Sequence, residues 1–280
     1  MYKILAFGEI IWDIFPDKKC IGGAPFNFSA HAVKQGATVY FASAVGNDKI
    51  GEEAVSMIKK YRINDQYVTK TDKQTGACNV TLDSNAIPSY DLLDDVAYDY
   101  IDAQNIAGEF DALYFGTLAL RRENNKVQIR EILKNCKFSE VFCDVNIRAP
   151  YYDEESVKLC CENATILKIS DEELHVIEKI LYGSESMKIE EFQTKLASDF
   201  PNLSLVIITK GSEGASVYRV STDSSFYFPA TKTKVVSTVG AGDSYSASFL
   251  LKYLKGGSIL DCMEKASVIS ASVVAKQGAI

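Results

Sequence analysis

The sequence predicts an α/β fold with three layers (α/β/α), in which helices cover both faces of a mainly parallel sheet and a small β-sheet is inserted. From residue 111 to about 209, short β-rich apolar runs alternate with helical patterns, and polar residues follow the end of each run. Between about 66 and 100, short alternating segments lie between turn residues, which predicts exposed antiparallel strands. A chain of 280 residues, 47% of them hydrophobic, can bury one large core, so we expect a single domain over 1–280.

The first part of the chain predicts two strand-helix units. The first strand ends at Gly8, and Pro25 then lies at the first position of a helix that ends near Gly36. A turn at 46–48 leads into the second helix. The expected elements are strands over 3–7 and 38–45 and helices over 25–36 and 49–60.

The small inserted sheet is expected from two segments, about 11–21 and 67–100. A sheet of this kind would act as a lid over a site, and lids exclude water from the site that they cover. Its exposed strand edges could also pair with a second copy of the chain in a homodimer.

The second half of the chain repeats the strand-helix alternation and ends in a hairpin and two helices. A run of buried strands separated by helices is typical of a parallel sheet covered on both faces. The strands are expected at 112–116, 140–145, 165–169 and 204–209, the helices near 123–135, 153–162, 171–181 and 188–198, the hairpin at 214–219 and 225–229, and the last helix around 258–276.

Polar clusters follow four successive strands of this predicted sheet. In open α/β sheets, ligands bind beyond the carboxyl ends of the strands, so four such clusters favour a binding site there. The clusters contain Gly116, Thr117 and Arg121; Asp144, Asn146 and Arg148; Lys168, Ser170 and Glu173; and Thr209, Gly211 and Gly214.

Residues 237–244 (Ser-Thr-Val-Gly-Ala-Gly-Asp-Ser), here called the anion cradle, have the pattern of a phosphate-binding turn that opens a helix. Gly240 and Gly242 let the backbone approach a ligand closely. Free N–H groups and the positive end of the helix dipole would face that ligand, so a phosphoryl group can be held without a lysine or an arginine. Asp243 is either a functional carboxylate or an ordinary first-turn acid, and the turn alone does not decide between these roles.

A second glycine-rich turn, Gly22-Gly23-Ala24-Pro25, lies between Asp13 and Asn27. Each of these two polar residues could be an ordinary turn or capping residue. Together, on either side of a Gly-Gly loop, they can also hydrogen-bond the vicinal hydroxyl groups of a sugar.

Composition excludes several other classes of protein. The net charge is −7 and no lysine- or arginine-rich run is present, which disfavours a nucleic-acid or anionic-membrane partner. The G-x-G-x-x-G motif of dinucleotide sites is absent after the first predicted strand. The two histidines, His31 and His175, have neither nucleophile nor zinc-protease motifs around them, so a packing or surface role is the simpler interpretation.

The cysteines and the N-terminus indicate the compartment. Seven cysteines without a C-x-x-C pair are typical of reduced, mostly buried thiols. The apolar run at the N-terminus is interrupted by Glu9, which makes it too short for a signal sequence, and no window reaches transmembrane length. We therefore expect a cytoplasmic protein.

Two motifs together resemble the signatures of the PfkB (ribokinase-like) carbohydrate kinases: residues 22–27, Gly-Gly-Ala-Pro-Phe-Asn, and residues 238–243, Thr-Val-Gly-Ala-Gly-Asp. The intermediate motifs agree in order along nearly the whole chain. The form of the first signature and the Asp-x-Asn-x-Arg segment at 144–148 most resemble the fructokinase branch. The resemblance implies a ribokinase-like fold and transfer of the γ-phosphoryl group of ATP to a primary hydroxyl of a sugar.

The resemblance also implies roles for individual residues. Asp243 matches the catalytic base, and the backbone of Gly240, Ala241 and Gly242 matches the anion hole. Glu173 matches the acid that helps to place Mg²⁺ through water. The implied sugar contacts are Asp13, Gly22, Gly23, Asn27 and Arg148. The implied nucleotide contacts are Thr209, Gly211, Gly214, Lys168, Ser170, Val239, Ser270 and Val274.

Two expectations concern charge at the anion cradle. A helix N-terminus should lower the pKa of Asp243 and keep this base ionised. The family has an aspartate at the start of the second signature that helps to form a monovalent-cation site, and Ser237 replaces it here. Potassium is therefore the one cofactor that the resemblance leaves open.

The resemblance allows several acceptors. Fructose is the acceptor we expect, with ribose, 2-keto-3-deoxygluconate and nucleosides as alternatives within the family. A second hypothesis is an inactive sugar-binding regulator on the same fold. Ser237 favours this hypothesis, whereas the intact Asp243 and the glycines of the anion cradle argue against it.

Overall fold

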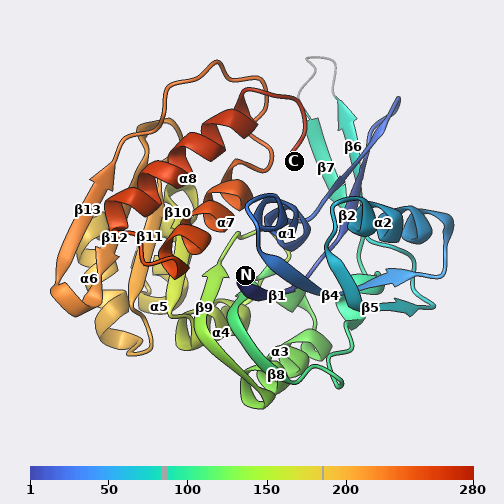
Figure 1. Ribbon diagram of the computed structural model, residues 1–280, viewed down its shortest axis with the longest axis horizontal. Coiled ribbons are helices and arrows are strands. Elements are labelled where there is room, and N and C mark those ends of the chain that lie inside the picture. Colours follow the sequence, from blue (N-terminus) through green and yellow to red (C-terminus); the bar gives the residue numbers. More distant parts are fainter. Residues whose placement is uncertain (83–87, 185) are drawn as a thin grey trace.

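The computed structural model describes residues 1–82, 88–184 and 186–280. Its middle layer is a nine-stranded sheet with the strand order β13-β12-β11-β10-β9-β8-β1-β4-β5 (Figure 1). Neighbouring strands are parallel except in the pairs β11/β12 and β12/β13. The second of these pairs is the predicted hairpin. The strands are β1 (Lys3–Phe7), β4 (Thr38–Gly46), β5 (Asn64–Thr71), β8 (Gly108–Phe115), β9 (Cys136–Asp144), β10 (Ile166–Ser170), β11 (Leu205–Thr209), β12 (Ala215–Arg219) and β13 (Ser224–Phe228).

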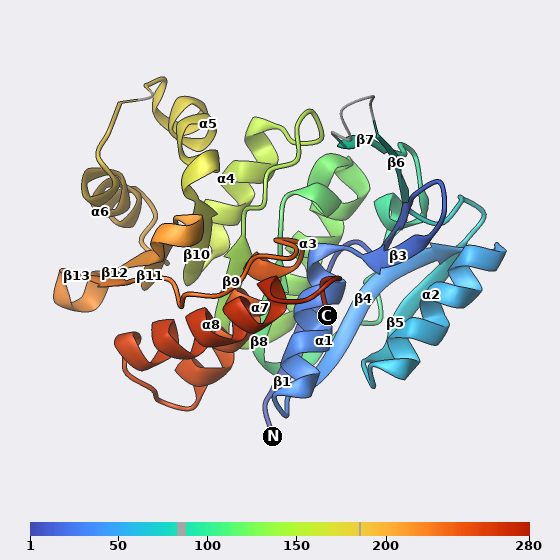
Figure 2. The same ribbon diagram turned by 90° about the horizontal axis from the view of Figure 1, so that it is seen from above.

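Helices cover both faces of this sheet (Figure 2). Alternate residues of β1 belong to different cores: Ile4 and Ala6 pack with one set of helices, and Leu5 and Phe7 pack with the other. The three-layer α/β/α prediction is therefore confirmed. One face carries α1 (Ala24–Lys34), α2 (Lys49–Lys60), α7 (Ala241–Leu254) and α8 (Ile259–Val274), and the other carries α3 (Glu123–Asn135), α4 (Glu154–Asn163), α5 (Asp171–Tyr182) and α6 (Ile189–Asp199).

A second, four-stranded sheet stands beside the main sheet and has the order β3-β2-β6-β7. We call it the small sheet. The pair β2/β6 is parallel and the other two pairs are antiparallel, so the expectation of antiparallel strands throughout was wrong for one pair. Its strands are β2 (Ile11–Ile14), β3 (Lys19–Gly22), β6 (Ala77–Leu82) and β7 (Pro88–Leu92).

The predicted boundaries of this inserted sheet need one correction. The range 67–100 begins inside β5, and β5 pairs with β4 in the main sheet. The exposed and half-buried residues of β5 are like those of β3, the edge strand of the small sheet, which explains the error. Residues 83–87 of the predicted range lie outside the described residues.

Trp12 fixes the small sheet to the main body of the molecule. It is the only tryptophan of the chain. Its ring lies on the face of β2 opposite to Asp13, is 6% exposed, and donates from Nε1 to the backbone oxygen of Ile50 in α2 over 2.9 Å. The small sheet is thus attached to the first strand-helix layer by both packing and a hydrogen bond.

Candidate active site

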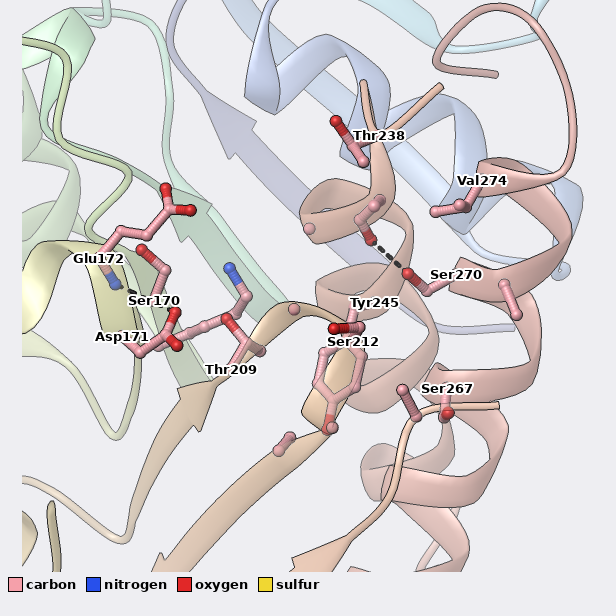
Figure 3. A pocket seen from close by; sticks show the side chains of 18 of the residues that line it. Ser170, Asp171, Glu172, Thr209, Ser212, Thr238, Tyr245, Ser267, Ser270 and Val274 are labelled. Atoms are coloured by element: carbon pink, nitrogen blue, oxygen red, sulfur yellow. Dashed lines mark hydrogen bonds between the residues drawn. The ribbon is translucent and has the colours of Figure 1, made fainter. Parts of the chain in front are cut away.

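A pocket of about 750 Å³ lies at the carboxyl ends of β9, β10 and β11, between these strands and helices α7 and α8. This is the edge of the sheet at which the sequence places its polar clusters. In Figure 3, Ser170 and Thr209 project from one side of the pocket, whereas Thr238, Ser270 and Val274 project from the other. Ser270 of α8 also donates to the backbone oxygen of Ala241 over 3.1 Å, which joins α8 to the start of α7.

Most predicted nucleotide residues line this pocket, and one does not. Val239 is 52% exposed and lies outside the lining, whereas Val235, four residues earlier, is part of it. The sequence cannot distinguish these valines because both lie in the same loop before α7 and the register of that loop is set by α8. The predicted residues that line the pocket are Lys168, Ser170, Glu173, Thr209, Gly211, Gly214, Ser270 and Val274, together with Ala241, Gly242 and Arg148.

The anion cradle forms the N-terminus of α7. Gly240 is the N-cap and has φ +79°, a left-handed conformation that favours glycine. A Cβ at this position would also lie 2.5 Å from the backbone oxygen of Ala279. The N–H groups of Gly242 and Asp243 donate to no backbone oxygen within the described residues, so they are free for an anion.

A buried ion pair lies directly beneath the cradle. Lys168 Nζ is 2.8 Å from each carboxylate oxygen of Asp144, and Ser246 Oγ donates to Asp144 Oδ2 over 2.9 Å. A Cβ on Gly242 would lie 3.5 Å from Lys168 Nζ. The carboxylate and the ammonium are both almost fully buried, so each needs the opposite charge of the other to compensate its loss of hydration. The pair places a fixed cation next to the N-terminus of α7.

Asp243 lies at the other side of the cradle, outside the lining of this pocket and next to α1. Asn27 Nδ2 of α1 donates to Asp243 Oδ2 over 2.8 Å. Asn27 Oδ1 is buried and has no hydrogen-bond partner among the described residues, so this amide keeps one acceptor for another group. The hydrogen bond joins the predicted sugar loop to the predicted phosphate site.

The expected lowering of the pKa of Asp243 was wrong. Its side chain is partly accessible, but protein atoms surround the carboxyl closely, and this burial raises the pKa to about 7. The negative charge of Asp144 raises it further, while the Asn27 hydrogen bond and the cations Lys168 and Arg148 lower it. Desolvation is the largest of these effects.

The predicted sugar-side residues gather around the turn between β3 and α1. Gly23 has φ +104°, and a Cβ on it would lie 2.5 Å from the backbone oxygen of Glu9, so only glycine fits there. Asp13 points toward Gly22, because a Cβ on Gly22 would lie 3.3 Å from Asp13 Oδ2. Burial raises the pKa of Asp13, and the charge of Arg148 opposes this shift.

Arg148 is exposed in the loop after β9 and lines the edge of the pocket. Within the described residues, its guanidinium forms no ion pair or hydrogen bond, although it lies near enough to Asp13 and Asp243 to lower the pKa of both. A cation with no such partner near these two carboxylates fits a contact with an acceptor or with a transferring phosphate.

The carboxylate of Glu173 is the group through which the site can contact a metal ion or its water ligands. Its two carboxylate oxygens accept the N–H groups of Ile147 and Ser170 at 2.5 and 2.7 Å, which leaves each oxygen one further lone pair. Within residues 1–82, 88–184 and 186–280, no group of three acidic, histidine or cysteine side chains could hold a metal ion. Single carboxylates facing a phosphate pocket suit Mg²⁺ that is carried by nucleotide phosphates and water.

Ser237 occupies the turn before the cradle. Its Oγ accepts the N–H of Val239 at 3.3 Å, and its own N–H donates to the backbone oxygen of Val274. The serine therefore closes the turn locally, and it brings no negative charge to it.

The sequence analysis did not assign roles to two residues that the structure brings into the site. Asp144 is the partner of Lys168, and Asn146 lines the pocket with a left-handed φ of +44°. From the sequence, the Asp-x-Asn-x-Arg segment predicts only a polar cluster at a strand end and a resemblance to the fructokinase branch. Assigning the ion pair would have required knowing that β9 and β10 are neighbours, with Asp144 opposite Lys168 in the register.

Comparison with known proteins agrees with this geometry. The profile of the "pfkB family carbohydrate kinase" matches residues 5–280. Fructokinase-2 of Oryza sativa subsp. japonica is 26% identical over 312 residues, covering 99% of this chain and 89% of the relative. The structure of an uncharacterized sugar kinase from Pyrococcus horikoshii in complex with ATP is 27% identical, with a TM-score of 0.82 over 99% of this chain and 93% of that chain. A fructokinase from Vibrio cholerae O395 with fructose, ADP and calcium ion bound shares the fold, with a TM-score of 0.85 at 23% identity over 100% of this chain and 94% of that chain.

The fold is that of the ribokinase-like α/β class, with the pocket at the carboxyl ends of its parallel strands. The chain belongs to the pfkB family of carbohydrate kinases, because the family profile spans nearly its whole length. None of the helices in the described part of the chain has the length and apolar content needed to cross a membrane.

Proposed function

We propose that the protein transfers the γ-phosphoryl group of ATP to a primary hydroxyl of a monosaccharide, with fructose as the acceptor. The observation that carries the proposal is the 2.8 Å hydrogen bond between Asn27 and Asp243. It joins the turn suited to sugar hydroxyls to the turn suited to a phosphoryl group. A carboxylate held between these two turns is placed to serve both substrates.

In this reaction, the acceptor oxygen forms a bond to the γ-phosphorus while the bond from phosphorus to the departing ADP oxygen breaks. Asp243 accepts the proton of the acceptor hydroxyl. The N–H groups of Gly242 and Asp243 and the N-terminus of α7 stabilise charge on the phosphoryl oxygens, with Lys168 directly beneath. Asn27 keeps Asp243 oriented toward the acceptor.

Bound together with ATP, Mg²⁺ would supply neutralisation of the phosphate charge. Glu173 and Ser170 are the residues that would contact its water ligands, since both line the pocket beside the cradle. The small sheet would act as the lid over the acceptor, and Asp13 is the residue through which it would reach the sugar.

Fructose is preferred because a plant fructokinase is among the relatives that match the chain over nearly its full length. Ribose, 2-keto-3-deoxygluconate and nucleosides are the alternatives, since the family includes kinases for different acceptors. Arg148 is exposed and unpaired within the described residues, which gives 2-keto-3-deoxygluconate, with its carboxylate, a specific partner.

A coupled assay of ADP release with a panel of these acceptors tests the proposal, run with and without potassium. We expect the highest kcat/KM with fructose. A higher value with another acceptor would replace fructose while keeping the reaction. Sugar binding by calorimetry without turnover on any acceptor would support the inactive regulator instead.

A further inference from the structure

Arg121, at the end of a short 3₁₀ helix (Leu118–Arg121), holds the segment that follows the small sheet. Its side chain is 4% exposed. Nε and Nη2 donate to the two carboxylate oxygens of the fully buried Asp99 at 2.7 Å each, and Nη2 also donates to the backbone oxygen of Leu93 at 2.9 Å. A bidentate pair of this kind fixes the plane of the guanidinium as well as its position.

Two tyrosines enclose the same guanidinium. Arg121 Cζ lies 4.9 Å from the ring centroid of Tyr98 and 5.1 Å from that of Tyr151. The hydroxyl of Tyr151 donates to the backbone oxygen of Leu92 over 2.8 Å. Two successive carbonyls where β7 ends, those of Leu92 and Leu93, are therefore bound by side chains of the main body.

Of the two residues that hold these carbonyls, Tyr151 also connects to both sides of the proposed acceptor site. The N–H of Tyr151 donates to the backbone oxygen of Arg148 over 2.6 Å, so Tyr151 closes the loop that carries this arginine. Leu92 is opposite Cys78 in the small sheet, and Cys78 is opposite Asp13. Arg148 and Asp13 are thus linked through Tyr151 and one row of the small sheet.

We propose that Arg121 and Tyr151 are positioning residues that hold the small sheet against the loop of Arg148 and so set the spacing between Asp13 and Arg148. The inference rests on the proposed function, because that function places the acceptor between these two residues. Neither Arg121 nor Tyr151 lines the nucleotide pocket. Loosening the contact should therefore affect the acceptor and leave ATP binding unchanged.

The first variant is Tyr151→Phe, which removes one hydroxyl and keeps the ring on Arg121. The matched control is Tyr152→Phe, since the hydroxyl of Tyr152 forms no hydrogen bond within the described residues. We expect Tyr151→Phe to raise the KM of the sugar about threefold to tenfold, the range for one lost hydrogen bond, and to leave the KM of ATP within about twofold. The control should change neither value.

Hydrogen exchange supplies a readout that does not need turnover. In Tyr151→Phe, the backbone amides of β6 and β7 should exchange about threefold to tenfold faster than in the parent protein or in Tyr152→Phe. Arg121→Lys keeps the charge but loses the bidentate geometry, so it should accelerate exchange further. If Arg121→Lys does not fold, Tyr151→Phe alone decides the test.

The outcomes separate the two proposals. Absence of turnover on every sugar by the parent protein would refute the proposed function, while the exchange rates would still report on the contact. Unchanged exchange in Tyr151→Phe, or an equal rise of the KM values of sugar and ATP, would overturn the positioning role. Faster exchange with a rise confined to the sugar KM would support it.

Discussion

At the scale of single residues, the charge of Asp243 is set by burial and by four neighbours from other parts of the fold. Burial and Asp144 raise its pKa, whereas Asn27, Lys168 and Arg148 lower it, and the balance lies at about 7. A carboxylate with a pKa near neutrality is a stronger base than an ordinary aspartate and is still largely ionised at slightly alkaline pH. The raised pKa therefore suits the proposed proton transfer better than the lowered value that the sequence suggested.

Asp243→Asn should reduce kcat by about 10² to 10⁴ and leave the binding of both substrates nearly intact, because the amide keeps the shape of the carboxyl and cannot accept the proton. Steady-state kinetics with sugar binding by calorimetry measures both effects. Asp65→Asn, on the remote edge strand β5, controls for the substitution itself. Near-normal turnover in Asp243→Asn would remove Asp243 from the role of base.

The pH dependence follows from the same group. In the proposed reaction the ionised form of Asp243 accepts the proton, so kcat/KM should rise with pH around a midpoint near 7. Stability should respond in the opposite sense: the folded protein favours the protonated acid, so this contribution to stability is present below pH 4 and is lost as pH rises through 7. A flat kcat/KM profile between pH 5 and 8 would contradict the assignment.

At the scale of elements, the N-terminus of α7 depends on one glycine. Gly240 and Gly256 have almost the same left-handed φ, +79° and +76°, but only Gly240 has neighbours within 4 Å, the nearest being the backbone oxygen of Ala279. The two positions therefore separate backbone strain from steric overlap. Any added atom at Gly240 must displace either the C-terminal segment or the cradle.

Gly256→Ala should lower the free energy of unfolding by ~1 kcal/mol and leave activity unchanged, because only strain is introduced. Gly240→Ala should cost ~3 kcal/mol and also raise the KM of ATP, because the overlap moves the N–H groups of the cradle. Urea denaturation and steady-state kinetics measure these effects. An equal decrease in the free energy of unfolding in the two variants would show that the contact with Ala279 does not contribute to the effect of Gly240→Ala.

The elements also show what local pattern can predict. The buried strands and the helices between them were predicted to within a few residues, because the 2-residue and 3.6-residue periods of the pattern are local properties. The assignment of residues 67–71 to the small sheet was wrong, because an edge strand of either sheet has the same half-exposed pattern. Which sheet a strand joins is decided by contacts that are distant in sequence.

At the scale of the whole molecule, the predicted site residues separate into two groups. Lys168, Ser170 and Thr209 line the pocket at the carboxyl ends of β9, β10 and β11, while Asp13 and Asn27 lie outside its lining and Asn27 donates to Asp243. The residues of both groups could be named from the sequence, because each belongs to a motif at a turn that the local sequence defines. The Lys168–Asp144 pair and the pKa of Asp243 were not predictable in this way, because they depend on which strands are neighbours.

The position of Trp12 makes its fluorescence a probe of the contact between the small sheet and α2. Its indole lies at the junction of the small sheet and α2, with Lys19 Nζ 4.9 Å from the ring centroid. As the chain has no other tryptophan, all indole emission comes from this junction. Addition of the acceptor sugar should shift the emission spectrum, whereas ATP alone should change it little. A titration that leaves the spectrum unchanged at saturating sugar would mean that the small sheet stays fixed on α2, and a shift would let movement of the small sheet be timed in the unlabelled protein.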